Sequence, residues 1–600
     1  MRVHSPNETS DYLLQVGKPV GVPSIEGSPA DTAMESRIRW RVGVLLWQLL
    51  FLGGVGAVCH TGSASECQST SPVPGTSLAG EGFDIVTLSA KGAYVVDVES
   101  WEHPDGTCTL CTNSQMEGER QRLPLAVVDW RAQRSCSRTL SSQLFRSVSE
   151  LAESINSRLD VSWRGDLSLQ PQPGQTVSVG LAGSKSKAMS FASHKAKSDR
   201  YSFTSHTFQC NLYRYRLKNP PPLSPQFSAH LGRITNTSYE GARHHYHRLV
   251  ETFGTHYIQL VKLGGSFKDL TAIRTCKAAA DGLTVEEVKD CLSVEASYEV
   301  IAAGKASAKS SFCKSKASSL SRGSSFHQVF NERLTETSGG HSIGDTDTLF
   351  SSDPTVFTSW LKSLKESPGL ISYKLYPLHY LLPDNDHRRD QLMLYLSEYI
   401  LANAQTPDCS KATCPAGKSK SASDPCSCLC PENNWTDRLC CAKQKGIGHL
   451  VVTVMRGFNL WGDRFTGTDG FVKVSYGRVK AQTSIVYDNN NPQWKARLDL
   501  GEVLATSDLK LTLTVYDEDD LWNEALGTCA VPLTSGSKDL TCYLRYGKVT
   551  YNLSFTCGSH LQGPTCHQYA PSAGGPGFQG LLWANQSSSS EIPSLKVIFP

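Results

Sequence analysis

Two acidic loops near the C-terminal end of the chain carry the residues best suited to bind a metal ion. Asp463 and Asp469 lie in one loop, and Asp517 and Asp519 directly follow a stretch of alternating apolar residues. Calcium takes roughly 6–8 oxygen ligands, which one loop of this size rarely supplies. Taken separately, each loop is an ordinary solvated turn. Two such loops at the same end of a β-sandwich can ligate together, and this arrangement favours a Ca2+ site.

Large apolar side chains adjoin these carboxylates. Trp461, Phe465, Leu521 and Trp522 are of the type that lies at a lipid–water interface, and Arg464 is placed to contact a lipid phosphate. Four or more carboxylates in one cup repel one another until a cation neutralises them. We therefore expect phospholipid binding that needs calcium and that fails in acid, because protonated carboxylates cannot ligate.

The elements that position these loops form an all-β region. Apolar alternation predicts short strands, separated by turns, in a sandwich of about eight strands. We expect two disulfides to brace this region, Cys529 with Cys542 and Cys557 with Cys566. The clearest strands are Leu450–Val454, Phe471–Tyr476, Leu509–Tyr516 and Val549–Phe555.

A helix followed closely by a strand marks the centre of a larger, preceding domain. Tyr246 and Phe253 belong to one apolar stripe of the helix, which Gly254 ends. The strand continues through Thr255, His256 and Tyr257, and we expect His256 to be a buried, hydrogen-bonded histidine rather than a catalytic or metal-binding one. Two glycine pairs further along are expected to let the sheet bend: Gly264, Gly265, Gly339 and Gly340.

Two segments, 177–217 and 292–334, begin with strand-like alternation and continue into Ser-, Ala- and Lys-rich sequence. Ala and Lys favour helix, while alternation favours strand, so each segment suits an element with two packings. Each is long enough for two membrane-crossing strands of roughly 9–11 residues. The alternative is a pair of surface helices that stay in water. In an extended strand Lys185 and Lys187 would lie on the same face as Met189 and Phe191, so that face would be neither clearly apolar nor clearly polar. The sequence therefore does not define a hairpin register.

The chain has 600 residues, a net charge of +3 and 20 cysteines. This length predicts two to four domains, the charge gives no reason to expect a nucleic-acid partner, and the even cysteine count indicates an oxidising compartment. A basic stretch followed by a short apolar run resembles a secretory signal peptide. Candidate glycosylation sites agree with secretion: Asn7, Asn236, Asn434, Asn552 and Asn585.

Three further sets of cysteines stand out. Cys108 and Cys111 resemble half of a zinc site, but no second half follows at the usual spacing, so disulfides are favoured. Cys276 and Cys291 flank a short predicted helix, and we expect them to pair with each other. Seven cysteines crowd residues 409–441, which predicts a disulfide-stapled module with one cysteine paired outside it.

The residues Tyr246, Phe253, Gly254, Thr255, His256 and Tyr257 reproduce the signature of the membrane-attack-complex/perforin (MACPF) family. The stretches 78–84 and 122–126 also resemble that family. The resemblance implies an α+β fold with a bent antiparallel sheet, like that of the cholesterol-dependent cytolysins, flanked by helical clusters. An EGF-like module and a C2 sandwich are implied to follow. It assigns calcium to Asp463, Asp469, Asp517 and Asp519, with Asn523 or Glu524 at a fifth position.

The expected organisation is an extension that precedes the start of translation (1–33), a signal peptide (34–57), a pore-forming domain (58–408), an EGF-like module (409–445), a C2 domain (446–566) and a disordered tail (567–600). The resemblance implies release from secretory granules, homo-oligomeric rings or arcs on a target plasma membrane, and β-hairpins inserted as a pore. The alternative is a non-lytic secreted adaptor that binds calcium and lipid. An enzyme is not expected, because no Gly-x-Ser-x-Gly or His-Glu-x-x-His motif is present.

Overall fold

The computed structural model describes residues 59–572 apart from 138–139, 170–180, 236–237, 301–307, 322–324, 342–353, 405–412, 423–427, 463 and 520–521. The expected signal peptide and most of the expected tail lie outside the described residues, as do Asn7, Asn236, Asp463, Leu521 and Asn585. Within the described parts, no helix combines the length and apolar character needed to cross a membrane.

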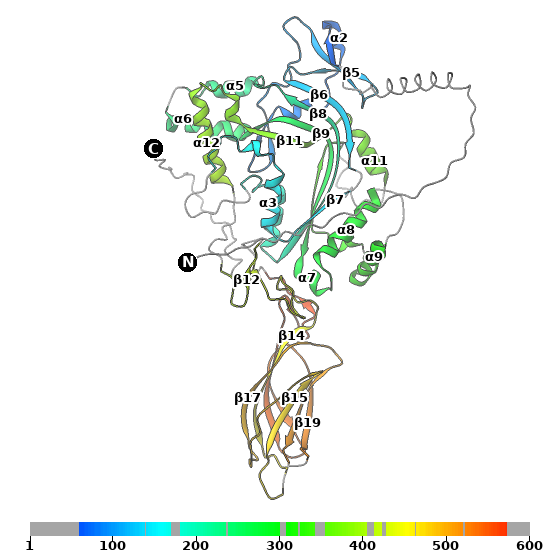
Figure 1. Cartoon of the computed structure of the whole chain (residues 1–600), viewed down its shortest axis with the longest axis vertical. Coiled ribbons are helices and arrows are strands. Elements are labelled where there is room, and N and C mark those ends of the chain that lie inside the picture. The colour runs from blue at the N-terminus through cyan, green and yellow to red at the C-terminus, as the bar shows by residue number, and fades with distance from the viewer. Residues whose placement is uncertain are drawn as a thin grey trace, which may run out of the picture. The chain divides into compact units, whose positions relative to one another are not determined.

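The first domain is built on an antiparallel sheet of eight strands within the described residues (Figure 1). Strands β3, β2, β9, β8 and β6 follow one another across it, with β7 paired to β8 and with β10 and β11 paired to β9. The bounds are β2 (Glu81–Asp84), β3 (Ser89–Tyr94), β6 (Val127–Cys136), β7 (Ser141–Phe145), β8 (Tyr201–Leu217), β9 (His256–Arg274), β10 (Arg333–Ser338) and β11 (Gly369–Pro377). A separate small sheet contains β1 (Cys59–Gly62), β4 (Cys108–Asn113) and β5 (Glu119–Leu123).

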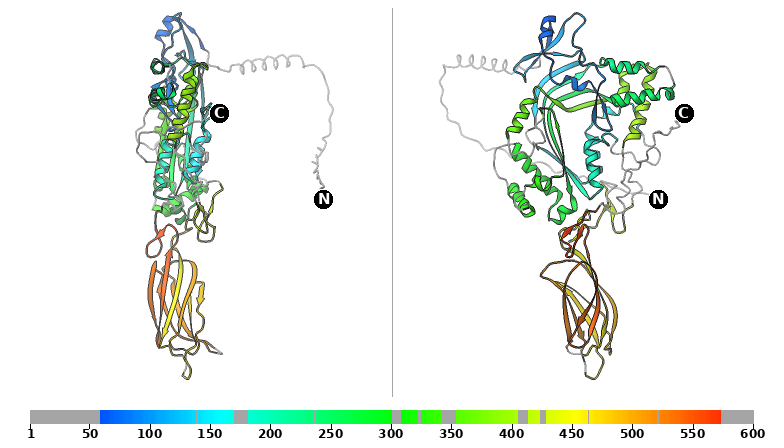
Figure 2. Two further views of the ribbon diagram at one scale, coloured as in Figure 1. Left: turned by 90° about the vertical axis from the view of Figure 1, so that its left-hand side faces the viewer. Right: turned by 180° about the vertical axis from the view of Figure 1, so that it is seen from behind.

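Helices flank this sheet in clusters, as Figure 2 shows from two further directions. The longer ones are α3 (Val148–Arg158), α4 (Lys187–Ala196), α5 (Pro225–Gly232), α6 (Tyr239–Phe253), α8 (Val285–Val300), α9 (Ala308–Ser321), α11 (Pro354–Ser363) and α12 (His387–Asn403). The shorter ones are α2 (Ala64–Ser69), α7 (Thr275–Ala280), α10 (Phe326–Val329) and the 3-10 turns Thr76–Ala79, Val161–Trp163 and Leu378–Leu381. The predicted bent sheet with flanking helical clusters is therefore confirmed.

The strand expected at the start of the second segment is wrong for this structure, because Leu292–Val300 is the second half of helix α8. Val288, Leu292 and Ala296 are fully buried at four-residue spacing, so the helical stripe packs against the core. Thr284 caps this helix by exchanging hydrogen bonds with Glu287, as the sequence predicts.

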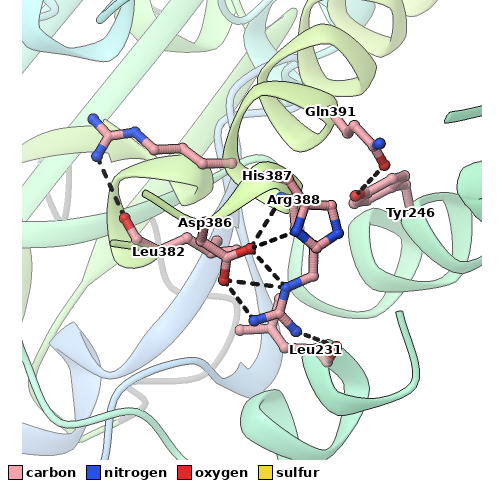
Figure 3. Close-up of polar contacts among 8 residues, drawn as sticks. Leu231, Tyr246, Leu382, Asp386, His387, Arg388 and Gln391 are labelled. Carbon is pink, nitrogen blue, oxygen red and sulfur yellow. Dashed lines mark hydrogen bonds and ion pairs between the residues drawn. The ribbon is translucent and has the colours of Figure 1, made fainter. Parts of the chain in front are cut away.

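The helix of the family signature, α6, is held against α12. Tyr246 is fully buried and its hydroxyl donates to Gln391 Oε1 at 3.0 Å (Figure 3). Arg388 donates to both carboxylate oxygens of Asp386 and to the Leu231 carbonyl at 2.9 Å. Helix α6 ends at Gly254, whose φ of 76° is costly for residues that carry a Cβ. The signature helix thus packs between neighbouring helices and the sheet.

His256 is fully buried, as expected, and both ring nitrogens have partners. Nδ1 lies 2.7 Å from Thr255 Oγ1, and Nε2 lies 2.7 Å from the Trp163 carbonyl oxygen. Burial lowers the His256 pKa to about 4, so the ring stays neutral at pH 7. Its function is therefore to join the start of β9 to the turn Val161–Trp163.

Replacing His256 by alanine is expected to lower the free energy of unfolding by about 2–4 kcal/mol, because the Trp163 carbonyl loses its partner and a cavity remains. Chemical denaturation followed by tryptophan fluorescence measures this loss. His244→Ala, at an exposed position of α6, is the matched control. Equal stability of both variants would contradict a joining role for His256.

The central sheet bends where the strands cross the first glycine pair, and Figure 1 shows β8 and β9 curving. Strand β9 continues through Gly264 and Gly265, but its register with β8 shifts between Asn211 and Tyr213. A Cβ on Gly264 would collide with the Cys210 carbonyl oxygen, so only glycine allows this approach. Gly339 and Gly340 follow β10 with φ of 77° and 78°. These observations fit the expected bend, produced by a bulge rather than by a break in β9.

The expected pairing of Cys276 with Cys291 is wrong: Cys276 pairs with Cys441, and Cys291 pairs with Cys313. The first of these links is the one expected to leave the cysteine-rich module. The other described disulfides are Cys59–Cys111, Cys67–Cys108, Cys136–Cys210, Cys414–Cys428, Cys430–Cys440, Cys529–Cys542 and Cys557–Cys566. Cys108 and Cys111 are thus disulfide-bonded, as favoured over a zinc site.

The last domain is a sandwich of two four-stranded sheets, in the orders β17-β14-β21-β20 and β16-β15-β18-β19. Its strands are β14 (Ile447–Phe458), β15 (Gly470–Tyr476), β16 (Val479–Gln482), β17 (Gln493–Leu504), β18 (Lys510–Asp517), β19 (Glu524–Pro532), β20 (Gly536–Tyr543) and β21 (Lys548–Cys557). Short two-residue strands flank it: β12 (Ser419–Lys420), β13 (Cys428–Leu429), β22 (Leu561–Gln562) and β23 (Gln568–Tyr569). The predicted eight-stranded sandwich is confirmed.

Candidate functional site

The sandwich brings the two acidic loops together at one end. Gly470 at the start of β15 pairs with Asp517 at the end of β18, so Asp469 and Asp517 lie side by side. The Asp469 backbone N–H donates to Asp517 Oδ1 at 2.6 Å. On the other side of β18, Glu524 at the start of β19 pairs with Asp517. The strand ends thus position three of the predicted ligands.

A third loop, between β16 and β17, completes this cup with a carboxylate that the sequence analysis missed. Asp488 donates its backbone N–H to Asp469 Oδ1 at 2.7 Å. Its own Oδ1 accepts from the Gly467 N–H at 2.6 Å. In the sequence Asp488 is marked only by its place directly before the run of asparagines that starts at Asn489.

The arrangement has the donor chemistry that a calcium ion requires. Asp517 is only 1% exposed, and the backbone of Gly462 lies so close that an added Cβ would collide with Asp517 Oδ2. Asp519, Asn523 and Glu524 are exposed beside it. Buried and exposed carboxylates gathered at one place repel one another unless a cation neutralises them. The donor types therefore suit a hard divalent cation with oxygen ligands, although the described acidic side chains do not themselves converge as a group of three or more.

Exposed aromatic side chains surround the cup. Phe465 is 98% exposed, Trp522 is 85% exposed and Trp461 is 45% exposed. Two further aromatics at this end were not predicted: Tyr487, whose hydroxyl donates to Glu518 Oε2 at 3.3 Å, and Tyr546, whose ring meets Trp461 edge-on at 4.9 Å. Arg464 is also exposed. Aromatic and cationic side chains beside a cation site suit contact with a lipid headgroup region.

Replacing Phe465 and Trp522 by serine is expected to weaken calcium-dependent binding to phospholipid vesicles. Each side chain can bury enough apolar area to contribute about 2 kcal/mol, so each loss costs roughly thirtyfold in affinity. Vesicle pelleting over a lipid titration measures the change. Leu509→Ser removes an apolar side chain, 40% exposed, from the residue directly before strand β18, at the opposite end of that strand from Asp517, and is the control. Unchanged pelleting of the double variant would contradict the membrane contact.

The second candidate region is the pair of helical clusters on the central sheet. Helix α4 covers an apolar face, where Ala188, Met189 and Ala192 pack with Tyr201 and Phe203. Glu332, which precedes β10, accepts hydrogen bonds from Lys195 of α4 at 2.7 Å, from Tyr201 at 2.8 Å and from Arg274 at 3.1 Å. A few charged contacts and a small apolar cluster thus hold α4 in place.

Helix α8 covers the opposite face of the same strands, which is polar although it is buried. Ser202, Thr204 and His206 of β8 are fully buried, as are Asp269 and Thr271 of β9. His206 Nε2 lies 3.0 Å from Ser293 Oγ of α8. Burial lowers the His206 pKa to about 4, so this ring is neutral at pH 7.

The strand face beneath α8 is thus polar, while α8 itself contributes the buried apolar stripe of Val288, Leu292 and Ala296. Releasing α8 would expose that stripe but would also hydrate the buried polar groups of the strands. The two clusters therefore suit elements that leave the sheet.

Comparisons with known proteins agree with this geometry. The model of the MAC/Perforin domain matches residues 71–409, and the model of the C2 domain matches residues 448–545. Perforin-1 of Homo sapiens is 41% identical over 518 residues, covering 86% of this chain and 93% of its own length. Perforin-1 of Mus musculus is 38% identical over 539 residues, covering 89% of this chain and 96% of its own length.

The chain is also more distantly similar to a complement component. Complement component C8 alpha chain of Oryctolagus cuniculus is 22% identical over 364 residues, covering 56% of this chain and 61% of its own length. The family model spans more than half of the chain and agrees with the signature residues, the bent sheet and the helical clusters. The chain therefore belongs to the MAC/Perforin family of pore-forming cytolytic proteins, combined here with a C2 domain.

Proposed function

We propose that this protein is secreted from granules, binds phospholipid of a target plasma membrane through its C2 domain when calcium is present, and assembles there into rings or arcs. The observation that supports this most strongly is the combination of an acidic, aromatic-rimmed cup with two helical clusters that lie on the strands they would extend. Calcium, when bound, supplies the positive charge that lets the cup approach lipid headgroups. Killing of target cells in immunity is the proposed outcome.

Within this proposal, Asp469, Asp517, Asp519 and Glu524 hold the cation, with Asp463 and Asn523 from the same loops. Asp488 positions Asp469 through its backbone N–H. Trp461, Arg464, Phe465, Leu521 and Trp522 contact the lipid. Asn434 is exposed, and Asn552 lies in β21 with its amide donating to Asp539 at 2.8 Å; both remain candidate glycosylation sites.

Assembly into rings or arcs needs a surface on one copy to meet a different surface on the next, because such contacts repeat around a closed circle. After assembly, α3–α4 and α7–α10 leave the sheet, and their segments extend β7, β8, β9 and β10 into hairpins. Hairpins from neighbouring copies then close a barrel, which leaves no strand edge exposed to lipid.

Dye release and pelleting on the same vesicles test this function. A pore-forming protein is expected to pellet with anionic vesicles and to release entrapped dye, both only when calcium is present. Negative-stain imaging of those vesicles is expected to show rings or arcs. Pelleting without any dye release would instead support the alternative, a calcium- and lipid-binding adaptor, which the relatives do not favour.

A further inference from the structure

The ladder between β9 and β10 has a constant register. Arg333 pairs with Thr271, and the pairing continues without a shift to Ser338 with Ser266. The next bond, from the Ala272 N–H to the Glu332 carbonyl at 2.7 Å, extends the same register by one residue. After Arg274, where β9 ends against β8, and before Glu332, the two segments leave the sheet for the helices α7–α10. The ladder therefore defines which residues of the two segments would lie opposite each other if both segments continued as strands.

The disulfide between α8 and α9 lies on that continued ladder. Twenty residues onward from Thr271 is Cys291, and twenty residues back from Arg333 is Cys313. The two cysteines are therefore the residues that an unshifted ladder places directly opposite each other. The bond from Ala272 to its direct partner Glu332 makes the even-numbered pairs the hydrogen-bonded ones, so Cys291 and Cys313 would form a non-hydrogen-bonded pair, whose Cα atoms lie roughly 4.5 Å apart. In the helical state their Cα atoms lie 5.4 Å apart, and both distances fall within the roughly 4.4–6.8 Å that a disulfide allows. The disulfide can persist in either state.

The same register separates polar from apolar residues. It places Leu292 opposite Phe312 on one face, and it places Ser293 opposite Ser311 on the other. Further along, Glu295 is placed opposite Lys309, a favourable cross-strand pair. Side chains of 297–310 lie outside those that the structure describes, so their pairing is counted from the sequence alone.

These two faces continue the faces of the existing sheet. Leu270 and Ala272 of β9 pack with Leu334 of β10 in an apolar cluster. Because side chains alternate along a strand, the even-numbered Leu292, Val294 and Ala296 would lie on this same face.

The odd-numbered residues form the other, polar face of the ladder. On this face Asp269 accepts a hydrogen bond from Thr335, its direct partner across the ladder. The faces of the sheet therefore match those of the continued hairpin, so no bulge is needed between them.

We propose that Cys291–Cys313 is a staple that holds the second hairpin in this register before, during and after insertion. Leu292, Val294, Ala296 and Phe312 face lipid. Ser293, Glu295 and Ser311 face the water-filled lumen together with the disulfide. This inference rests on the proposed pore-forming function and assigns the residues that carry it out.

The same count can be made for the first hairpin. Strands β7 and β8 pair without a shift from Ser141 with Thr207 to Phe145 with Phe203. Twenty-two residues onward from Phe145 is Leu167, and twenty-two residues back from Phe203 is Leu181. Both leucines share the parity of Phe203, which lies on the apolar face of the sheet. An unshifted ladder would place Leu167 and Leu181 toward lipid, but it would place Lys185 and Lys187 on the same face, so the register of the first hairpin is left out of the proposal.

Single cysteines at Leu292, Ser293, Ser311 and Phe312 test the register. No free cysteine occurs among the described residues, so an introduced thiol can carry an environment-sensitive dye. In pores on anionic vesicles with calcium, dyes at Leu292 and Phe312 are expected to shift to the blue and to be quenched by nitroxide lipids. Dyes at Ser293 and Ser311 are expected to be quenched by iodide in water. The opposite pattern, or no alternation, would overturn the register.

The redox state of the pores tests the staple. After alkylation of membrane-inserted protein without reductant, peptide mapping is expected to recover Cys291 linked to Cys313. Dye release that occurs only after this disulfide is reduced would overturn the proposal, because the link would then be a lock. If pores form with the disulfide intact but the dyes fail to alternate, only the register is wrong. Absence of dye release from both oxidised and reduced protein would overturn the pore-forming function itself.

Discussion

The double substitution Asp469→Asn/Asp517→Asn is expected to abolish calcium-dependent binding to phospholipid vesicles. These two carboxylates lie side by side at the strand ends, and Asp517 is almost completely buried beneath the Gly462 backbone. Loss of a residue that only supports a metal ligand costs roughly 10–100-fold in affinity. Loss of two ligand charges is therefore expected to raise the calcium requirement beyond that range. Vesicle pelleting over a calcium titration measures the effect.

The asparagine side chains keep the shape of the cup, because the amide introduced at position 517 would retain an oxygen to accept the backbone N–H at position 469. Thermal unfolding without calcium is therefore expected to occur at the same or a higher temperature than in the unaltered protein, because two mutually repelling charges are removed. Asp508→Asn, in the turn before β18 at the other end of that strand, is the matched control and is expected to bind normally. Normal calcium-dependent pelleting of the double variant would show that the cup is not the calcium site.

A reducible thiol cross-link between positions 206 and 293 is expected to abolish lysis while leaving vesicle binding intact. His206 Nε2 of β8 lies 3.0 Å from Ser293 Oγ of α8, so the variant His206→Cys/Ser293→Cys places two thiols facing each other across the length of the lost imidazole. A short bis-methanethiosulfonate reagent, which forms a disulfide with each thiol, can span that gap and join the helix to the sheet. With that cross-link formed, α8 cannot leave, and β8 and β9 cannot extend into the membrane. Dye release from vesicles in the presence of calcium is expected to fall to background.

Mild reduction is expected to restore dye release by this variant, with the unaltered protein treated identically as a control. Each single substitution serves as a matched control, and peptide mapping establishes which cysteines are joined. Full lysis by the protein that carries the verified 206–293 cross-link would show that α8 stays on the sheet when the pore forms.

The sequence predicts the sandwich well because each strand is local and strictly alternating. Residues 450–454 and 549–555 form the predicted strands at the centre of their sheet. It predicts the signature helix for a similar reason, since Tyr246, Leu249, Val250 and Phe253 are all buried on one stripe. Local periodicity is sufficient where one packing is strongly preferred.

The second segment shows where local periodicity fails. Leu292, Val294 and Ala296 alternate as a strand does, yet Val288, Leu292 and Ala296 also form a helical stripe that is buried in this structure. Both patterns are present in the same residues, so the sequence alone cannot choose between them. The β9–β10 register supplies the missing information, because it relates the alternation to a neighbouring chain segment.

The disulfides and the third acidic loop needed tertiary structure for another reason. Cys276 pairs with Cys441 at a sequence separation of 165, and spacing along the chain does not predict such a partner. Asp488 has no acidic neighbour in its loop, so only the approach of its backbone to Asp469 reveals its place in the cup.

The most direct measurement is the release of an entrapped dye from anionic vesicles by the purified, fully oxidised protein, with and without calcium. Rapid release with calcium, none with chelator and an intact Cys291–Cys313 link in the inserted protein are the expected results. Protein that coats the vesicles in calcium yet leaves the dye inside would contradict the formation of a pore.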